Sequence, residues 1–420
     1  MNRRDFLTIG SAALLTPLAA RGSDKVINAR SRFAGKKVGV PERGKFYHGV
    51  YPGTPSCTGN EDDIQFSDLD SYQKTVGRNA AWVYFSNNWM TTQEFPGATA
   101  KWISGAGSTP FIRLMLRSTT TQNTLKLKYE RTRCKEITGR CDPEKHNSEI
   151  TCNFENKYSL DFILKDRKTK DDLIRWGINA KKFGKPLIVE WGTEMNGYWF
   201  AWNGWWSGKA EGVEKFKATY KYIHKLITEE GGADNVTWVF HVNNSDDPNI
   251  YDDENAARCI GWNKFENYYP GDFIDWLGVS VYGALEPSDD YCTPFKETMD
   301  EVYDRLAAMT PNKPIMLLEF GVTMNNKKCG TEPASDKCNE VTSGAAKWAN
   351  DALSEIFTNP KYRERLRGFS WWNECWENDD GRDPKKNTNM RVQTVPCLKE
   401  VFQKKFTENK DKIVDKAIEI

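Results

Sequence analysis

The sequence predicts an α/β protein with the (β/α)8 or TIM-barrel fold, in which eight parallel strands alternate with helices around a closed sheet. Eight short apolar segments of strand length recur along the chain, and segments with helical periodicity separate them. No Gly-rich phosphate loop follows the first segment, which disfavours a doubly wound open sheet, the structural alternative. Since barrel active sites lie at the C-terminal ends of the strands, polar residues at those ends are candidate site residues.

The expected strands are Phe46–Tyr51, Ala80–Phe85, Thr109–Leu116, Pro186–Trp191, Val236–Val242, Trp276–Val281, Pro314–Glu319 and Gly368–Trp372. Helical periodicity is clearest from Val213 to Ile227, where apolar residues recur every three or four positions until Gly231 and Gly232. Asp171–Phe183 and Met299–Leu306 follow the same pattern. This alternation predicts one catalytic domain over residues 45–406.

One segment interrupts the repeat. Between the third and fourth strands, at about residues 118–170, lies a charged insertion that contains Cys134, Cys141 and Cys152. We expect it on the catalytic face, where it is either a disulfide-tied loop that shapes one end of a cleft or a solvated decoration. Residues 23–44 are expected to form an N-terminal linker. Residues 407–420 are expected to form a charged tail, within a charged helix over Lys404–Ile420.

The first 22 residues have the character of a twin-arginine export signal. Arg3 and Arg4 precede Phe6-Leu7 and a mild apolar run to Ala20. That run is too short for the alternative, a single membrane anchor. We therefore expect an exported protein, periplasmic or secreted, with no membrane association after signal cleavage.

The cysteines agree with an oxidising destination. There are 10 of them, without a C-x-x-C pair, and only 4 histidines, so disulfides are favoured over a zinc site. Cys329 and Cys338 are close enough in sequence to tie a loop, but the sequence does not give the connectivity. No motif indicates a metal ion or a cofactor.

Charge and aromatic content indicate the class of partner. The 59 Lys and Arg residues nearly balance the 58 Asp and Glu residues, so neither a nucleic acid nor a membrane surface is indicated. Tryptophan is unusually abundant, at 16 residues. The clusters WFAWNGWW and WWNECW are difficult to bury completely, which favours a ligand surface over core filling alone. Flat rings of this kind stack on the apolar faces of sugars.

Two glutamates stand at the ends of buried strands. Glu194 follows the apolar run Pro186–Val189, and Glu319 ends Pro314–Glu319. By strand count they belong to the fourth and seventh strands, so a closed barrel brings both to one opening. Two carboxyls roughly 5–5.5 Å apart are what a retaining glycosidase requires, one as nucleophile and one as acid/base. A lone glutamate of this kind would more simply be a structural ion pair.

The residues around these glutamates resemble glycoside hydrolase family 26, and the match is clearest from Lys185 onward. The motifs that carry the resemblance are Glu194-Met195-Asn196-Gly197-x-Trp199 with Trp202, Tyr269–Asp272, Asp275–Val279 and Glu319-Phe320-Gly321. Members of that family are retaining barrel enzymes that act on β-mannans and, in some branches, on mixed-linkage β-glucans or β-1,3-xylans. The resemblance implies that Glu194 is the acid/base and Glu319 the nucleophile. It further implies that Tyr282 contacts the nucleophile and that Trp372 forms the aromatic floor beneath the cleaved sugar.

Two positions depart from the family pattern. Thr193 stands directly before the acid/base, where the family usually has histidine, and Glu190 stands four residues before it, where the family usually has arginine. A carboxylate in place of a cation would raise nearby pKa values. Pairing of Glu190 with Arg113 or Arg117 of the third strand is the alternative. These departures leave the mannan preference open.

Further candidates are weighed against structural roles. His241 is expected either to bind a sugar hydroxyl or to be a packed histidine of the core. Asn196 is expected either to bind the sugar 2-hydroxyl or to stabilise the turn after Glu194. Trp199 and Trp202 are candidate sugar platforms, and Glu374 and Glu377 compete for the catalytic roles from beyond the last strand. The expected function is a retaining, endo-acting glycoside hydrolase of β-1,4-mannan. A mixed-linkage β-glucanase or β-1,3-xylanase of the same fold, an exo-acting enzyme and a non-catalytic glycan-binding protein remain the alternatives.

Overall fold

The computed structural model describes residues 36–53, 57, 61–117, 158–197, 199–247, 261–378 and 386–420. The predicted export signal lies outside these residues, as do the linker up to residue 35 and most of the Cys-rich insertion, residues 118–157. Among the described residues, no helix combines the length and the apolar character needed to cross a membrane.

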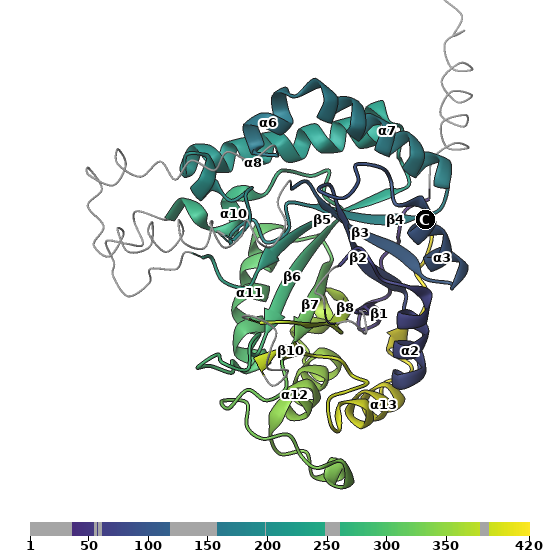
Figure 1. The fold of residues 1–420 in the computed structure, drawn as a ribbon, viewed down its shortest axis with the longest axis vertical. Helices are drawn as coiled ribbons and strands as arrows, with labels where there is room; N and C mark the ends of the chain where they lie inside the picture. The colour runs from purple at the N-terminus through teal and green to yellow at the C-terminus, as the bar shows by residue number, and fades with distance from the viewer. Residues whose placement is uncertain are drawn as a thin grey trace, which may run out of the picture. The chain divides into compact units, whose positions relative to one another are not determined.

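The chain forms a closed barrel of eight parallel strands, which confirms the predicted (β/α)8 fold (Figure 1). Neighbouring strands pair in sequence order, and β8 pairs with β1 to close the sheet. The strands are β1 (Phe46–Tyr51), β2 (Trp82–Asn88), β3 (Thr109–Met115), β4 (Leu187–Trp191), β5 (Val236–Asn243), β6 (Trp276–Tyr282), β7 (Ile315–Gly321) and β8 (Leu366–Trp372). The predicted strands match these with shifts of a few residues at their ends.

The shifts matter at two strands that carry polar side chains. β2 continues past Phe85 to Asn88, because its polar residues are paired inside the protein. Asn87, for example, accepts a hydrogen bond of 3.0 Å from Nε1 of Trp176. β7 continues past Glu319 to Gly321, so Glu319 lies within the strand and not at its end.

Helices surround the strands, as Figure 1 shows. They are α2 (Phe66–Val76), α3 (Gly97–Gly105), α6 (Leu160–Lys165), α7 (Arg167–Phe183), α8 (Ala210–His224), α10 (Phe265–Tyr268), α11 (Phe295–Met309), α12 (Gly344–Thr358) and α13 (Leu398–Glu408). The apolar stripe predicted from Val213 to Ile227 is buried, along α8 and the π-helical turn η2 (Lys225–Glu230) that continues it. Short 3-10 helices are η1 (Gly204–Ser207), η3 (Gly261–Asn263), η4 (Ser335–Glu340) and η5 (Tyr362–Glu364).

The C-terminal segment differs from the predicted charged helix over Lys404–Ile420. Helix α13 ends at Glu408, and the chain then forms β11 (Ile413–Val414), which pairs in parallel with the first residues of β1. The reason lies in the register of the barrel: β1 pairs with β2 only at Gly49 and Val50, which leaves its first residues available to β11. Further on, Ile420 exchanges two backbone hydrogen bonds with Lys37 of the predicted linker, and the carbonyl of Ile418 accepts one from the N–H of Gly39.

Three disulfides lie in the described part of the chain. They join Cys57 to Cys375, Cys292 to Cys329 and Cys338 to Cys397. The suggested pairing of Cys329 with Cys338 is therefore wrong, because each bonds a cysteine of another segment. Cys375 belongs to β9 (Cys375–Trp376), which pairs with β10 (Thr388–Asn389), so the first disulfide ties the loop after β1 to the hairpin after β8. Cys134, Cys141 and Cys152 lie outside the described residues.

The turn after β4 depends on Gly192. Its φ angle is +68°, and a Cβ atom there would lie 2.5 Å from the ring of Phe216. Gly77, which ends α2, has a similar φ of +74° but open space around it. The two glycines therefore separate the cost of a left-handed backbone from the cost of steric overlap.

We predict that Gly192→Ala lowers the free energy of unfolding by about 2–4 kcal/mol, from strain and overpacking together. Gly77→Ala, the matched control, should cost only about 1–2 kcal/mol from strain. Urea unfolding of the variants measures both values. Equal losses in the two variants would contradict the packing explanation.

Candidate active site

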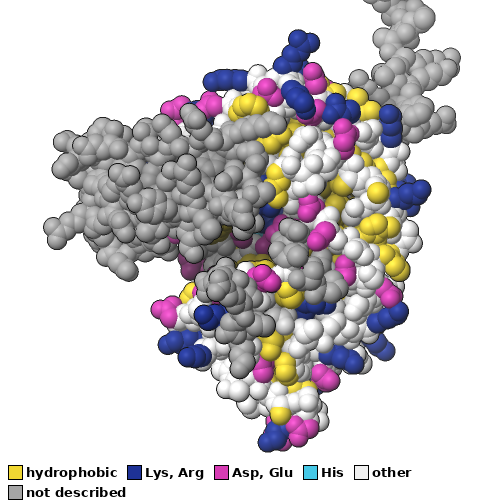
Figure 2. Space-filling view, in the orientation of Figure 1, with side chains coloured by type: hydrophobic (Ala, Val, Ile, Leu, Met, Phe, Trp, Pro, Cys, Tyr) yellow, Lys and Arg dark blue, Asp and Glu magenta, His cyan; other side chains and the backbone are white. Residues whose placement is uncertain are grey.

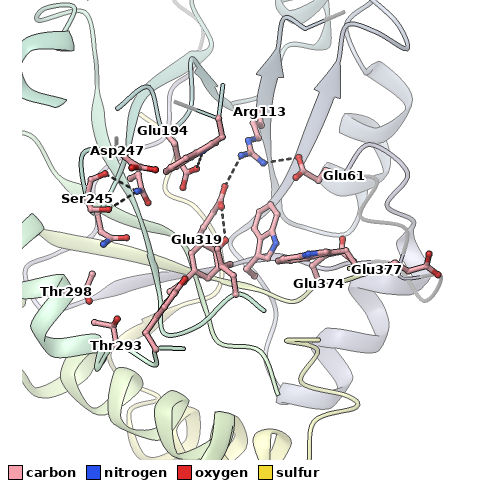
Figure 3. A pocket seen from close by; sticks show the side chains of 18 residues that line it. Glu61, Arg113, Glu194, Ser245, Asp247, Thr293, Thr298, Glu319, Glu374 and Glu377 are labelled. Carbon is pink, nitrogen blue, oxygen red and sulfur yellow. Dashed lines mark hydrogen bonds and ion pairs between the residues drawn. The ribbon is translucent and has the colours of Figure 1, made fainter. Parts of the chain in front are cut away.

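A cavity of about 760 Å³ lies at the C-terminal ends of the barrel strands. Two groups of side chains dominate its wall (Figure 3). The carboxylates are Glu61, Glu194, Asp247, Glu319, Glu374 and Glu377, and the aromatic residues are Trp199, Tyr282, Tyr291, Trp372 and Trp376. Among the described lining residues, Arg113 is the only cationic side chain. Acidic side chains are also visible near the middle of the face drawn in Figure 2.

Glu194 lies in the turn after β4, and its backbone is held in an uncommon conformation. Its φ angle is +47°, a left-handed value that costs a residue with a side chain on the order of 1–3 kcal/mol. Two backbone bonds fix it: the Glu194 N–H donates to the carbonyl of His241 at 2.9 Å, and the Gly197 N–H donates to the Glu194 carbonyl at 2.8 Å. In the side chain, Oε2 accepts a 2.9 Å bond from Nε1 of Trp199. The turn thus aims the carboxyl into the cavity.

Glu319 projects from β7 into the same space as Glu194 (Figure 3). It is only 4% exposed. Its Oε1 accepts a 3.2 Å bond from the hydroxyl of Tyr84 and lies 3.5 Å from Nη2 of Arg113. Its Oε2 accepts a 2.8 Å bond from the hydroxyl of Tyr282. Donors on three other strands therefore fix both oxygens.

The surroundings of Glu319 also set its protonation. Burial raises the pKa of Glu319 to about 7; Arg113 opposes this rise, whereas the charges of Glu194 and Glu190 add to it. The pKa of Tyr282 is raised by burial and by Glu319, so its hydroxyl keeps the proton that it donates. Near neutral pH, Glu319 is therefore poised between its two forms.

Glu190 lies beneath the site, fully buried on β4. Arg113 Nε is 3.8 Å from its Oε1, and the hydroxyl of Tyr84 donates to the same oxygen. Of the two partners considered from the sequence, the structure pairs Glu190 with Arg113. Arg117 instead donates to the side-chain oxygen of Asn88 at 2.9 Å.

The structure brings together five of the eight site residues expected from the sequence. Glu194, Glu319, Trp199, Tyr282 and Trp372 all line the cavity. Trp372 stacks on Tyr51 with a centroid separation of 4.3 Å, which holds its ring at the end of β8. The competing carboxylates Glu374 and Glu377 line the cavity as well.

The other three expected residues are buried behind the cavity wall. Asn196 is fully buried, and its amide bonds the backbone of Asn243 and Ser245, so it secures the turn. Trp202 is 2% exposed, donates to the carbonyl of Thr193 at 2.8 Å and stacks on Phe200. His241 is fully buried between neighbouring strands. Direct sugar contact by these three does not fit their positions.

The sequence did not single out several other residues of the site. The single hydroxyl of Tyr84 lies within hydrogen-bond distance of both Glu190 and Glu319, and Glu61 binds Arg113 at 2.9 Å. Tyr291 and Trp376 add aromatic surface to the cavity wall. Their signals were weak, because Tyr84 resembles any strand tyrosine and the other three lie in loops or a two-residue strand. WWNECW was the one cluster that pointed to Trp376.

Comparison with known proteins adds sequence relatives and a solved fold. The chain is 25% identical over 219 residues to Endoglucanase H of Acetivibrio thermocellus. The aligned region covers 51% of this chain and 21% of the relative. It is also 25% identical over 255 residues to Beta-1,3-xylanase TXYA of Vibrio sp, which covers 57% of this chain and 47% of the relative. The chain thus spans less than half the length of each of these curated relatives.

A solved structure supports the fold. A GH26 β-mannanase from Bacteroides ovatus, BoMan26A, superposes with a TM-score of 0.51 at 15% identity, covering 89% of this chain and 90% of that one. At that identity the likeness shows the barrel alone. The model of Glycosyl hydrolase family 26 matches residues 167–378, slightly more than half of the chain, including both Glu194 and Glu319. The chain therefore belongs to glycosyl hydrolase family 26.

Proposed function

We propose that this chain is a retaining, endo-acting glycoside hydrolase that cleaves internal β-linkages of a polysaccharide. One observation carries the proposal: two buried carboxyls project into one aromatic-lined cavity, Glu194 from the turn after β4 and Glu319 from β7. Their hydrogen bonds differ in a way that suits two roles. Glu319 is surrounded by donors, whereas Glu194 receives one donor at Oε2.

In the first step, the ionised Glu319 attacks the anomeric carbon and forms a covalent glycosyl ester. Glu194 gives its proton to the glycosidic oxygen as that bond breaks, so the leaving sugar departs with a hydroxyl group. The Trp199 bond to Oε2 leaves Oε1 of Glu194 to carry this proton. Tyr84, Tyr282 and Arg113 stabilise the Glu319 carboxylate before attack and when it is released.

In the second step, the now ionised Glu194 takes a proton from water, and the resulting hydroxide attacks the anomeric carbon. The ester bond to Glu319 breaks, and the sugar leaves with its original β configuration. Each carboxyl returns to its starting state, so the cycle is redox-neutral and consumes only water.

The polymer is best sought among neutral β-linked polysaccharides. Trp372 and Trp376 offer rings for stacking, and the excess of carboxylates around the cavity disfavours polymers rich in uronic acids. We propose β-1,4-mannan as the substrate, in line with the mannanase from Bacteroides ovatus. The names of the two sequence relatives make β-glucan and β-1,3-xylan the substrates to compare.

We also propose that the protein is exported. Arg3 and Arg4 with the apolar run that follows them support a twin-arginine signal. The three disulfides are typical of an oxidising compartment.

The decisive test is reducing-sugar release from β-mannan, mixed-linkage β-glucan, β-1,3-xylan and β-1,4-xylan. We expect the wild type to hydrolyse one polymer, and Glu194→Gln and Glu319→Gln each to lose roughly 1,000-fold or more in kcat/KM. With an aryl glycoside whose leaving group needs no proton, Glu194→Gln should keep a rapid first step, whereas Glu319→Gln should remain inactive.

Glu301→Gln, on the exposed face of α11, is the matched control and should keep full activity. Full activity in either cavity variant would mean that the wrong carboxylate is named. Tight binding of one polymer without any hydrolysis would favour a glycan-binding protein.

The pH dependence follows from Glu319. The nucleophile must be ionised, and burial raises its pKa to about 7. The kcat/KM of the wild type should therefore rise with increasing pH through about pH 7, because the ionised fraction of Glu319 grows over that range. An acid limb centred below about pH 5 would contradict the raised pKa.

A further inference from the structure

Beneath the cavity, three neighbouring strands carry buried ionisable side chains. Arg113 is on β3, Glu190 on β4 and His241 on β5, with 5%, 0% and 0% exposure. Glu190 and His241 do not line the cavity, so they have no access to a substrate. A fully buried carboxylate is costly unless it is paired, so this arrangement requires an explanation.

The two oxygens of Glu190 have different surroundings. Its Oε2 lies 2.9 Å from Nδ1 of His241, yet no donor among the described residues is aligned on that oxygen. The same nitrogen lies 2.8 Å from Oγ1 of Thr193, toward which it is directed. At this distance an unprotonated Nδ1 would turn its lone pair toward the carboxylate, so the contact indicates a proton on Nδ1. On the other side of the ring, the Ser280 hydroxyl beside Nε2 can accept a hydrogen bond from a second proton. An unaligned, buried carboxylate oxygen at this distance favours a positively charged ring over a neutral one.

We propose that Glu190 keeps His241 as an imidazolium and that this second buried cation acts with Arg113 to favour the ionised form of Glu319 against the effect of burial. The consequence for catalysis rests on the proposed function. In this arrangement Glu190 and His241 are positioning residues, because they act on the reaction through Glu319 and Glu194.

The charges around His241 agree with a protonated ring. Burial lowers the pKa of His241, but Glu190, Glu319 and Glu194 together outweigh it, and the pKa is raised. The groups that face the cluster from other strands are Tyr84 on β2, Arg113 on β3, Ser280 on β6 and Glu319 on β7. His241 in turn lowers the pKa of Glu319, in the same sense as Arg113.

The same histidine also contacts the turn that carries the proposed acid/base. Its carbonyl accepts the backbone N–H of Glu194, and its ring contacts the side chain of Thr193. On its other side, Nε2 lies 2.8 Å from Oγ of Ser280. Glu190 therefore connects to Glu319 through the Tyr84 hydroxyl and to the Glu194 turn through His241.

The first test is independent of activity. Imidazole ¹⁵N NMR of the wild-type protein should show His241 with both nitrogens protonated at pH 7, assigned by the signal that His241→Gln removes. The chain has only 4 histidines, so the spectrum is simple. A neutral His241 at pH 7 would overturn the inference, even in an active enzyme. An imidazolium in a protein that hydrolyses no polymer would instead contradict the proposed function.

The second test is the acid limb of kcat/KM. His241→Gln removes the cation but keeps Glu190, so the limb should move upward by roughly one pH unit. In the double variant Glu190→Gln/His241→Gln both charges are absent, and the limb should return toward that of the wild type. His224→Gln, which alters a histidine at the end of α8, is the matched control and should leave the limb in place.

A purely structural role would not give this reversal, since the double variant would then be at least as impaired as the single one. An unmoved or lowered limb in His241→Gln, or a double variant that shifts further upward, would contradict the proposal.

Discussion

The site is organised around the guanidinium of Arg113. It lies 2.9 Å from Glu61, 3.8 Å from Glu190 and 3.5 Å from Glu319, and it is almost completely buried. These carboxylates come from the loop after β1, from β4 and from β7. Loss of a buried cation leaves its partners uncompensated, at a typical cost of 3–5 kcal/mol. One side chain on β3 thus makes it possible to gather several carboxylates around a single cavity.

Charge balance alone does not orient the carboxyl groups, and contacts of the backbone position them as well. Glu194 is held at φ +47° by the carbonyl of His241, on the neighbouring strand β5. Gly192 permits the chain to leave β4 closely packed against Phe216. On the opposite side, the disulfide from Cys57 to Cys375 fixes the hairpin whose Trp376 lines the cavity. The turn after β4 and the hairpin after β8 are thus each held in place by contacts with other parts of the barrel.

Much of the fold followed from sequence periodicity. Buried parallel strands read as apolar runs, and the helix from Val213 onward showed its stripe, so strand count and order were predictable. The C-terminal segment was not, because its structure depends on backbone left unpaired by β1, which no local pattern reports. No local pattern reports the disulfide partners either, since the two cysteines of a pair can lie far apart in the sequence: Cys57 and Cys375 are 318 positions apart.

The residues of the candidate site were also predictable only where a local sequence pattern marked them. Glu194 and Glu319 were identifiable because each follows or ends an apolar run beside a recognisable motif. Asn196, Trp202 and His241 sit in the same motifs or strands but face inward, and only the three-dimensional turn shows which way a side chain points. Tyr84 and Glu61 gave only weak signals, because their role arises from contacts with Arg113, Glu190 and Glu319 across other strands.

The central claim is that Glu319 is the nucleophile of a retaining mechanism. The most direct measurement is to trap the covalent intermediate with an activated 2-deoxy-2-fluoro glycoside of the sugar that the protein hydrolyses, and to locate the label by mass spectrometry of peptides. We expect a single sugar attached to Glu319. A label on Glu194, Glu374 or Glu377, or hydrolysis with inversion and no trapped ester, would contradict it.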